Sequence, residues 1–293
     1  MKRAHVALFV AIVSVSFAAV LIVSTEAAPL TIALYRMLFT TLLLAPFFVL
    51  RRYRRELARL GRHDLLVLGG IGIVLACHFS FWISSLEHTS VASSVILVTA
   101  HPVLVAPLAY HFFRERISRV NIMGIALSLL GVGVLVGGNY DLDAGTLHGN
   151  LLAMLGGVAA GVYILGGRRM RHRLSTPVYA LMVYGVATVT LAGIVLVAGA
   201  PLAGIGARSY GLILLMALVP GIFGHTLYNW SLRYVRASVA SVSLLGEPLG
   251  STVLAFALPW IHQVPSWFTV AGGGCILLGI YLASRTVARP EPL

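Results

Sequence analysis

Two ionisable residues stand immediately before prolines inside otherwise apolar stretches of the chain. The stretch "SVASVSLLGEP" ends in Glu247-Pro248, and "SVASSVILVTAHP" ends in His101-Pro102. A charge near the centre of a bilayer costs from about 2.5 kcal/mol upward, so it should face a partner or a water-filled cavity. Glu247 can hold an ammonium group or carry a proton, and His101 can donate or accept a proton near neutral pH. Proline frees backbone carbonyls, so Pro102 and Pro248 can act as hinges. Alternatively, both prolines only shape their helices and Glu247 is protonated or paired with a histidine.

Arg36 is the other charged residue inside an apolar stretch that could do chemistry. An arginine side chain presents a fork of N–H groups that can bind a substrate carboxylate through two hydrogen bonds. The same side chain could instead pair with Glu26 or cap neighbouring carbonyl groups. Both interpretations remain open at this point.

Polar and aromatic side chains at helical spacing extend the set of candidate cavity residues. Residues four apart share one helix face, and aromatic walls suit an apolar side chain or a cation. The candidates are His78, Trp82, His225, Tyr228, Asn229 and Trp230, with Phe17 and Tyr163 as further wall residues. The alternative for each is hydrogen bonding and packing between helices. Cys77 and Cys275 lie in apolar stretches and predict packing residues, and no spacing indicates a metal site or a cofactor.

The elements that position these residues are transmembrane helices. Hydrophobic residues make up 59% of the 293 positions, charged residues only 10%, and the mean hydropathy is +0.94. About 20 apolar residues are needed to cross a bilayer as a helix. The sequence predicts ten such helices, centred on residues 4–23, 30–50, 65–86, 91–112, 119–138, 148–167, 177–199, 209–231, 238–260 and 266–284. We therefore expect an all-α integral membrane protein.

The net charge of +12 reflects membrane topology and not a nucleic-acid partner. In the ten-helix arrangement almost all lysines and arginines fall on one side of the bilayer. Positive residues in short loops mark the cytoplasmic side, so both termini are expected there. The segment "RRYRRELARLGRH" belongs to that side; we interpret it as a solvated loop, with contact to anionic lipid as the alternative.

The chain contains an internal duplication. "SVAS" recurs at an offset of 148 residues, from Ser90 to Ser238, and the same offset carries Pro29 to Pro177, Trp82 to Trp230 and Gly124 to Gly272. Residues 1–143 and 144–293 are therefore two five-helix repeats. Because five is odd, the second repeat enters the membrane from the opposite side. Inverted repeats around a central cavity are typical of transporters.

The sequence also resembles the ten-helix, EamA-type exporters of the drug/metabolite transporter superfamily. The resemblance covers nearly the whole chain and includes "LYRMLFTTLLL", "SLEHTSVASSVILVTAHP", "SLRYVRASVASVSLLGEPLGSTVLAF" and "GGGCILLGIYL". It implies a basket-like ten-helix fold with a central cavity, and export of amino acids or other small metabolites.

These observations predict a secondary transporter that exports amino acids or related metabolites by alternating access. An intramembrane acid-base enzyme and a passive channel are the alternatives. The enzyme is disfavoured because the sequence has no nucleophile or HExxH motif, and the channel because polar groups are few. The sequence contains no nucleotide-binding pattern, so transport should use a gradient. We expect a monomer in the plasma membrane of a prokaryote.

Overall fold

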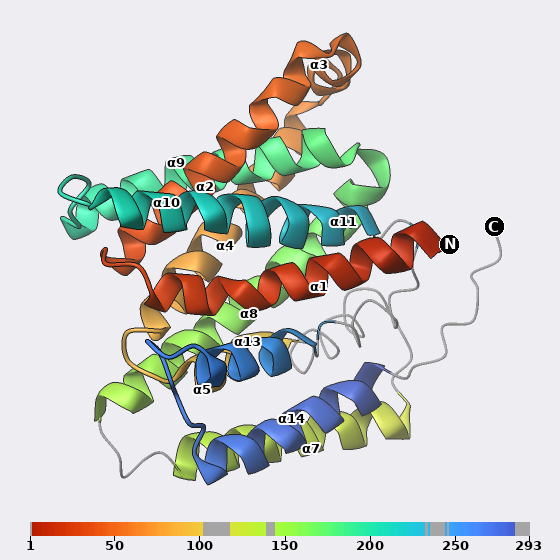
Figure 1. The fold of residues 1–293 in the computed structure, drawn as a ribbon. Coiled ribbons are helices and arrows are strands. Elements are labelled where there is room, and N and C mark those ends of the chain that lie inside the picture. The colour runs from red at the N-terminus through yellow and green to blue at the C-terminus, as the bar shows by residue number, and fades with distance from the viewer. Residues whose placement is uncertain are drawn as a thin grey trace.

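The computed structural model of the protein describes residues 2–101, 118–138, 144–231, 234, 244 and 246–284, and every regular element within these ranges is a helix (Figure 1). The helices of the first half are α1 (Lys2–Val23), α2 (Pro29–Leu44), η1 (Ala45–Val49), α3 (Arg51–Ala58), α4 (Arg62–Ser85), α5 (Val91–Thr99) and α7 (Arg119–Gly138). Those of the second half are α8 (Ala144–Arg173), α9 (Thr176–Ala198), α10 (Ala207–Met216), η2 (Ala217–Thr226), α11 (Leu227–Ser231), α13 (Gly246–Ala257) and α14 (Trp267–Ser284).

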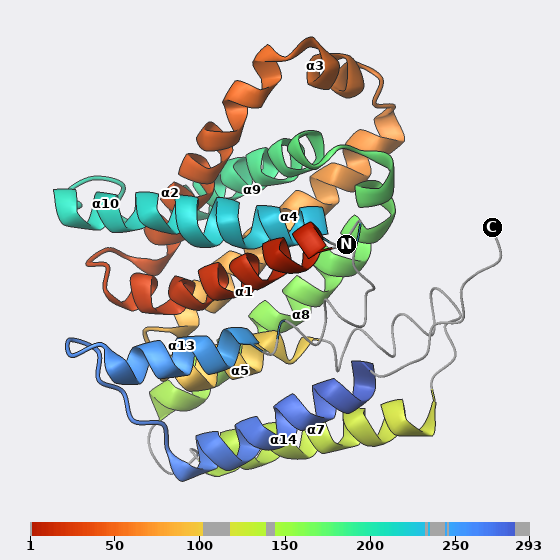
Figure 2. The same ribbon diagram turned by 45° about the vertical axis from the view of Figure 1, so that its right-hand side comes forward.

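The predicted all-α membrane architecture is confirmed. Among the described residues, seven helical stretches are long and apolar enough to cross a bilayer, and a shorter apolar helix spans Trp267–Leu282. The predicted helices at 91–112 and 238–260 lie partly outside the described residues, so the count of ten stays a prediction. The first residues of α1 and the last residues of α14 lie at the same side of the bundle (Figures 1 and 2).

Local sequence explains where several helices begin and end. Proline lies in the first turn of both α2 and α9, where its missing N–H costs nothing. The Ser90 hydroxyl accepts a 3.1 Å hydrogen bond from the Ser93 backbone N–H and caps the start of α5. The α9 helix ends at Ala198 and is followed by Gly199, whose φ of 65° is a left-handed conformation that glycine adopts without strain.

The contacts between helices occur in pairs that the 148-residue offset interchanges. The α4 helix packs against α8, and α1 packs against η2; likewise α5 packs against α8, and α13 packs against α1. Three further contacts, α2 with α9, α5 with α13 and α7 with α14, each join elements that the offset makes equivalent. The α7 and α14 helices lie side by side at one end of the bundle (Figures 1 and 2).

The contact between α7 and α14 depends on glycines that let the two backbones approach. A Cβ atom added to Gly131 would lie 2.6 Å from the carbonyl oxygen of Gly272, and one added to Gly272 would lie 2.6 Å from that of Gly131. A Cβ added to Gly279 would lie 2.5 Å from the carbonyl oxygen of Gly124. In a bilayer the hydrophobic effect does not drive helices together. Small residues let the two backbones approach closely, so that van der Waals packing stabilises the contact.

The predicted eighth helix is not uniformly α-helical. Residues Ala217–Thr226 form a π-helical stretch around Pro220, between α10 and α11. Proline cannot donate the hydrogen bond that an α-helix requires, and the wider turn accommodates it. Because π-helical turns are frequent at functional sites, this segment directs attention to His225 near its end.

Candidate functional site

A cavity of about 90 Å³ lies between the helices and has room for several water molecules. The structure brings most of the predicted site residues to its wall. From the first half of the chain these are Arg36, His78, Trp82 and His101. From the second half they are Tyr163, His225, Tyr228, Asn229 and Glu247. The polar and aromatic faces expected from helical spacing therefore meet at one place.

Arg36 is the most unusual of these side chains. It lies two turns into α2 and is only 1% exposed, yet its Nη1 and Nη2 atoms have no hydrogen-bond partner among the described residues. Neither of these two atoms makes the expected alternatives, a pair with Glu26 or bonds to nearby carbonyls. Its guanidinium carbon instead lies 4.6 Å from the centre of the Phe79 ring. Such a contact stabilises a cation without using its N–H groups.

Trp82 supplies a third donor without a partner. Its side chain is 2% exposed, and its indole Nε1 has no hydrogen-bond partner within the described part of the chain. The guanidinium carbon of Arg36 lies 5.7 Å from the Trp82 ring centre. Buried polar groups are normally satisfied, and an unsatisfied group in a native structure requires an explanation. Three such N–H donors in one cavity form an arrangement suited to an acceptor such as a carboxylate.

Histidines and aromatic rings surround Arg36. His78 stacks on Trp82 with ring centroids 5.9 Å apart and 12° between the planes, and its Nδ1 donates to the Gly156 carbonyl oxygen at 2.9 Å. His225 meets the edge of Phe79 with centroids 6.1 Å apart. The hydrogen bond to a carbonyl fixes the proton of His78 on Nδ1 and leaves Nε2 available as an acceptor when the ring is neutral.

Glu247 supplies the acidic group of the site. Its carboxylate and the Arg36 guanidinium attract each other, although they form no direct ion pair in the described structure. Glu247 lies in the first turn of α13, where the helix dipole favours a carboxylate. The cavity thus presents an acidic and a basic side chain that a ligand with both charges could join.

Two helices end or begin next to this cavity. The α5 helix ends at Thr99, two residues before His101, and α13 begins at Gly246, immediately before Glu247. His101 Nδ1 lies 3.3 Å from the Val98 carbonyl oxygen. Pro248 is buried in the first turn of α13 and is not among the residues that line the cavity, while Pro102 lies outside the described residues. Interrupted helices at membrane depth are tolerated where they line a cavity.

A hydrogen bond between Tyr163 and Asn229 links two of the helices that form the cavity wall. The Asn229 side-chain amide donates to the Tyr163 hydroxyl oxygen at 3.3 Å, which joins α11 to α8. Tyr228 precedes Asn229 and lines the same cavity. Their placement agrees with the four-residue spacing between His225 and Asn229.

Phe17 is not at the cavity, contrary to the expectation. Its side chain is 38% exposed on the outside of α1, whereas Ala11, Ile12 and Val15 of the same helix line the cavity. At 100° per residue, Phe17 points about 200° away from Val15. The 148-residue offset pairs Tyr163 with Val15, which lines the cavity.

Trp230 is also not at the cavity. It packs near Leu8 and lies 4.8 Å from the Tyr234 ring, measured between ring centroids. On α11 it is rotated about 100° beyond Asn229, so it leaves the face that carries Tyr228 and Asn229. The π-helical stretch before it changes the direction of the later side chains relative to a regular α-helix such as α4.

The cavity lining also contains two aromatic residues that were not predicted, although the sequence contained a signal for each. Phe79 adjoins His78 and contacts Arg36. Tyr184 of α9 lines the cavity, and the 148-residue offset places it at the position equivalent to Arg36. Its hydroxyl lies 3.4 Å from that of Thr226.

The described residues contain no group of three histidine, cysteine or acidic side chains arranged to hold a metal ion. Both cysteines are free thiols.

Comparison with known proteins places these features in context. Residues 4–137 and 147–285 each match the model of the EamA-like transporter family. An uncharacterized transporter of Archaeoglobus fulgidus is 28% identical over 271 residues, which cover 88% of this chain and 89% of that protein. The uncharacterized transporter YyaM of Bacillus subtilis is 25% identical over 232 residues, covering 77% and 74% of the two chains.

Two further comparisons concern cargo and fold. A "Probable terminal-alkyne amino-acid exporter" of Streptantibioticus cattleyicolor is 27% identical over 220 residues, covering 68% of this chain and 65% of that protein. A solved crystal structure superposes with a TM-score of 0.67 over 97% of this chain and 96% of its own, at 20% identity. The last likeness shows that the fold is shared.

Proposed function

Because the chain belongs to the EamA-like transporter family and is therefore a membrane transporter, we propose that it exports amino acids or related small metabolites. Transport proceeds by alternating access and uses a gradient. The host membrane is the plasma membrane of a prokaryote, and the protein acts as a monomer.

The observation that carries the cargo assignment is the set of unpartnered donors in the cavity. Arg36 Nη1 and Nη2 and Trp82 Nε1 have no partner among the described residues. A cargo carboxylate would satisfy these donors, and a hydrogen bond to a charged group contributes about 1.5–3 kcal/mol. An uncharged cargo without an acceptor would leave them unsatisfied.

The opposite end of an amino acid fits the opposite charge of the cavity. Glu247 can accept hydrogen bonds from an ammonium group, and the surrounding aromatic rings provide further attraction for a cation. A zwitterion would thus replace the unpaired Arg36 and Glu247 charges with two direct contacts. The amino-acid exporter among the relatives supports this cargo class.

Alternating access is supported by the duplication. We propose that residues 1–143 and 144–293 are inverted five-helix repeats that move against each other around the cavity, with Pro102 and Pro248 as hinges. The two separate family matches support this division, as do the helix contacts that the 148-residue offset interchanges. Arginine-rich loops at one end of the helices favour a cytoplasmic location for that end and for both termini.

The test is counterflow of labelled amino acids in liposomes that contain the purified protein, with Glu247→Gln compared with Glu87→Gln. Glu87 is an exposed acid between α4 and α5, so it controls for the loss of one carboxylate. We expect saturable exchange of some amino acids, preserved in Glu87→Gln and lost in Glu247→Gln. Exchange that survives in Glu247→Gln would leave Glu247 a structural role. A panel in which no amino acid exchanges would overturn the cargo assignment.

The same liposomes separate a carrier from a channel. Cargo on the far side of the membrane accelerates uptake by a carrier that must reorient. A passive channel shows no such trans-stimulation and does not saturate over the same range. Chemical modification of the recovered cargo would indicate the enzyme alternative.

A further inference from the structure

A second cavity, separate from the central one, lies at the arginine-rich end of the helices. It has a volume of about 570 Å³ and lies between α3 and the end of α8. Its charged lining comprises Arg52, Arg55, Glu56, Arg59, Asp64 and Arg173. The lining residues of α3 and α8 fall between membrane-spanning stretches, since the neighbouring spans are Pro29–Val49, Arg62–Ser85, Gly145–Gly167 and Thr176–Ala198. The basic cavity is thus positioned where spans end.

The α3 helix directs only one of its faces toward this cavity. Arg52, Arg55, Glu56 and Arg59 are spaced at i, i+3, i+4 and i+7, which places them on one side of a helix. Arg51 and Arg54 are exposed on the same helix but do not line the cavity. The chain therefore contains two sets of arginines that differ in position and not in charge.

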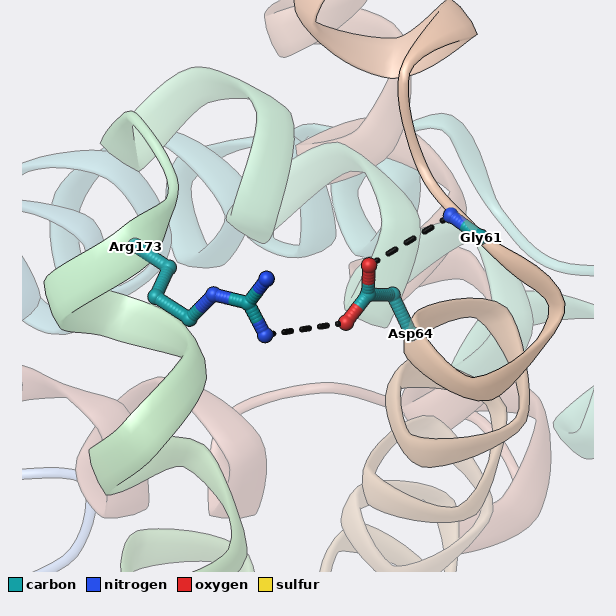
Figure 3. A network of polar contacts seen from close by, with 3 residues as sticks. All are labelled: Gly61, Asp64 and Arg173. Atoms are coloured by element: carbon teal, nitrogen blue, oxygen red, sulfur yellow. Dashed lines mark hydrogen bonds and ion pairs between the residues drawn. The ribbon is translucent and has the colours of Figure 1, made fainter.

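The two acidic groups of the cavity are occupied by partners within the protein. Glu56 accepts hydrogen bonds from the Ser175 backbone N–H at 2.6 Å and from the Ser175 hydroxyl at 2.7 Å, at the start of α9. Asp64 accepts from the Gly61 backbone N–H at 3.4 Å and from Arg173 at 3.3 Å (Figure 3). Asp64 thus pairs with an arginine, and the oxygens of Glu56 are held by the start of α9.

Arg55 and Arg59 remain without an acidic partner in the part of the chain that the structure describes, and both are exposed. Arg52 is held in place by a 2.7 Å hydrogen bond to the Tyr53 hydroxyl oxygen, with its guanidinium carbon 4.5 Å from that ring centre. The lining holds four arginines and two acidic residues, so an excess of positive charge remains in the cavity and attracts an anion. Arginine binds phosphate through paired hydrogen bonds.

Apolar side chains adjoin this basic cavity along the chain. Val49 is 78% exposed and Leu50 46% exposed immediately before α3, and Leu66 is 76% exposed near the start of α4. Such side chains at the ends of membrane spans suit contact with acyl chains. A free anion would use the arginines alone, whereas a phospholipid would use the arginines and the apolar side chains together.

We propose that the cavity between α3 and the end of α8 binds the phosphate head group of an anionic phospholipid, with its acyl chains along the adjoining apolar side chains. Basic pockets between membrane helices are suited to such head groups, and each arginine near an anionic surface contributes about 1 kcal/mol. Under this proposal the segment "RRYRRELARLGRH" binds a lipid head group, whereas the sequence alone favoured a solvated loop. The inference is independent of the cargo.

The test uses the full-length protein, purified in a non-ionic detergent, and a titration with short-chain phosphatidylglycerol. The thermal unfolding midpoint is measured, because a ligand that binds the folded state raises it saturably. Phosphatidylcholine with the same chains is the lipid control, and inorganic phosphate is the free-anion control. Arg55→Gln/Arg59→Gln is compared with Arg51→Gln/Arg54→Gln, which removes the same charge from arginines of α3 that do not line the cavity.

We expect phosphatidylglycerol to raise the midpoint, and phosphatidylcholine and phosphate to leave it unchanged. The apparent Kd for phosphatidylglycerol should weaken at least about tenfold in Arg55→Gln/Arg59→Gln. It should change by less than about threefold in Arg51→Gln/Arg54→Gln. Equal weakening in both variants would indicate diffuse electrostatic attraction to the arginines and not a specific site. A shift of the midpoint with phosphate alone would indicate a free-anion site. The absence of a saturable shift would favour the solvated loop expected from sequence. Each of these outcomes would overturn the proposal.

Discussion

The guanidinium carbon of Arg36 lies 4.6 Å from the centre of the Phe79 ring, while both terminal nitrogens of the arginine lack partners among the described residues. In a desolvated setting, a cation beside an aromatic ring gains about 2 kcal/mol. The contact therefore stabilises the buried charge and leaves its N–H groups available. This combination is expected of a binding group and is unusual for a structural ion pair.

Replacement of Arg36 by lysine should weaken cargo binding although it keeps the charge. Lysine cannot offer the planar pair of N–H donors that a carboxylate accepts. We expect the apparent affinity in amino-acid counterflow to fall at least about tenfold, which corresponds to about 1.4 kcal/mol. Arg208→Lys, on an exposed arginine of α10, is the matched control and should behave as wild type. Unchanged affinity in Arg36→Lys would exclude a paired hydrogen bond to the cargo.

Replacement of Trp82 by phenylalanine should isolate the contribution of the indole N–H. The ring contacts with His78 and Arg36 are largely kept, and the unpartnered Nε1 donor is removed. If this donor binds cargo, the apparent affinity should fall about fivefold, from the loss of about 1 kcal/mol. The control is Trp230→Phe, because Trp230 is the repeat equivalent outside the cavity. Equal effects of the two substitutions would contradict a specific role for the Trp82 indole.

The sequence predicted the fold class and most of the cavity because both depend on patterns that repeat. Apolar stretches of sufficient length specify membrane helices, and buried polar residues at helical spacing specify a shared face. Arg36, His78 and Glu247 were found in this way. A charged group inside a membrane must face a partner or a water-filled cavity, so its position in the sequence indicates where such a cavity lies.

The errors occurred where a constant offset or a constant helical turn was assumed. Phe17 and Tyr163 were both expected as wall residues, but the 148-residue offset pairs Tyr163 with Val15, which does line the cavity. Trp230 follows a π-helical stretch, whose geometry changes the direction of later side chains. Tyr184 was missed because tyrosines in apolar helices are common, and only its equivalence to Arg36 distinguishes it.

Replacement of Glu56 by alanine should destabilise the protein through the start of α9. Glu56 binds the backbone N–H and the hydroxyl of Ser175, the residue that precedes this helix. Loss of such a cap typically costs about 0.5–2 kcal/mol. We expect a lower thermal unfolding midpoint in detergent, with no comparable change in Glu87→Ala. An equal decrease in the two variants would show that the cap contributes nothing specific.

Replacement of Gly131 by valine should separate α7 from α14. A Cβ atom at this position would lie 2.6 Å from the Gly272 carbonyl oxygen and 2.8 Å from the Ile276 nitrogen, and these backbone atoms cannot move aside independently. Overpacking of this kind costs about 1–3 kcal/mol, so the thermal unfolding midpoint should fall. Gly133→Val provides the control in the same helix, because a Cβ there meets nothing within 4 Å. If both substitutions lowered the midpoint equally, the cause would be valine in α7 and not the approach of the two backbones.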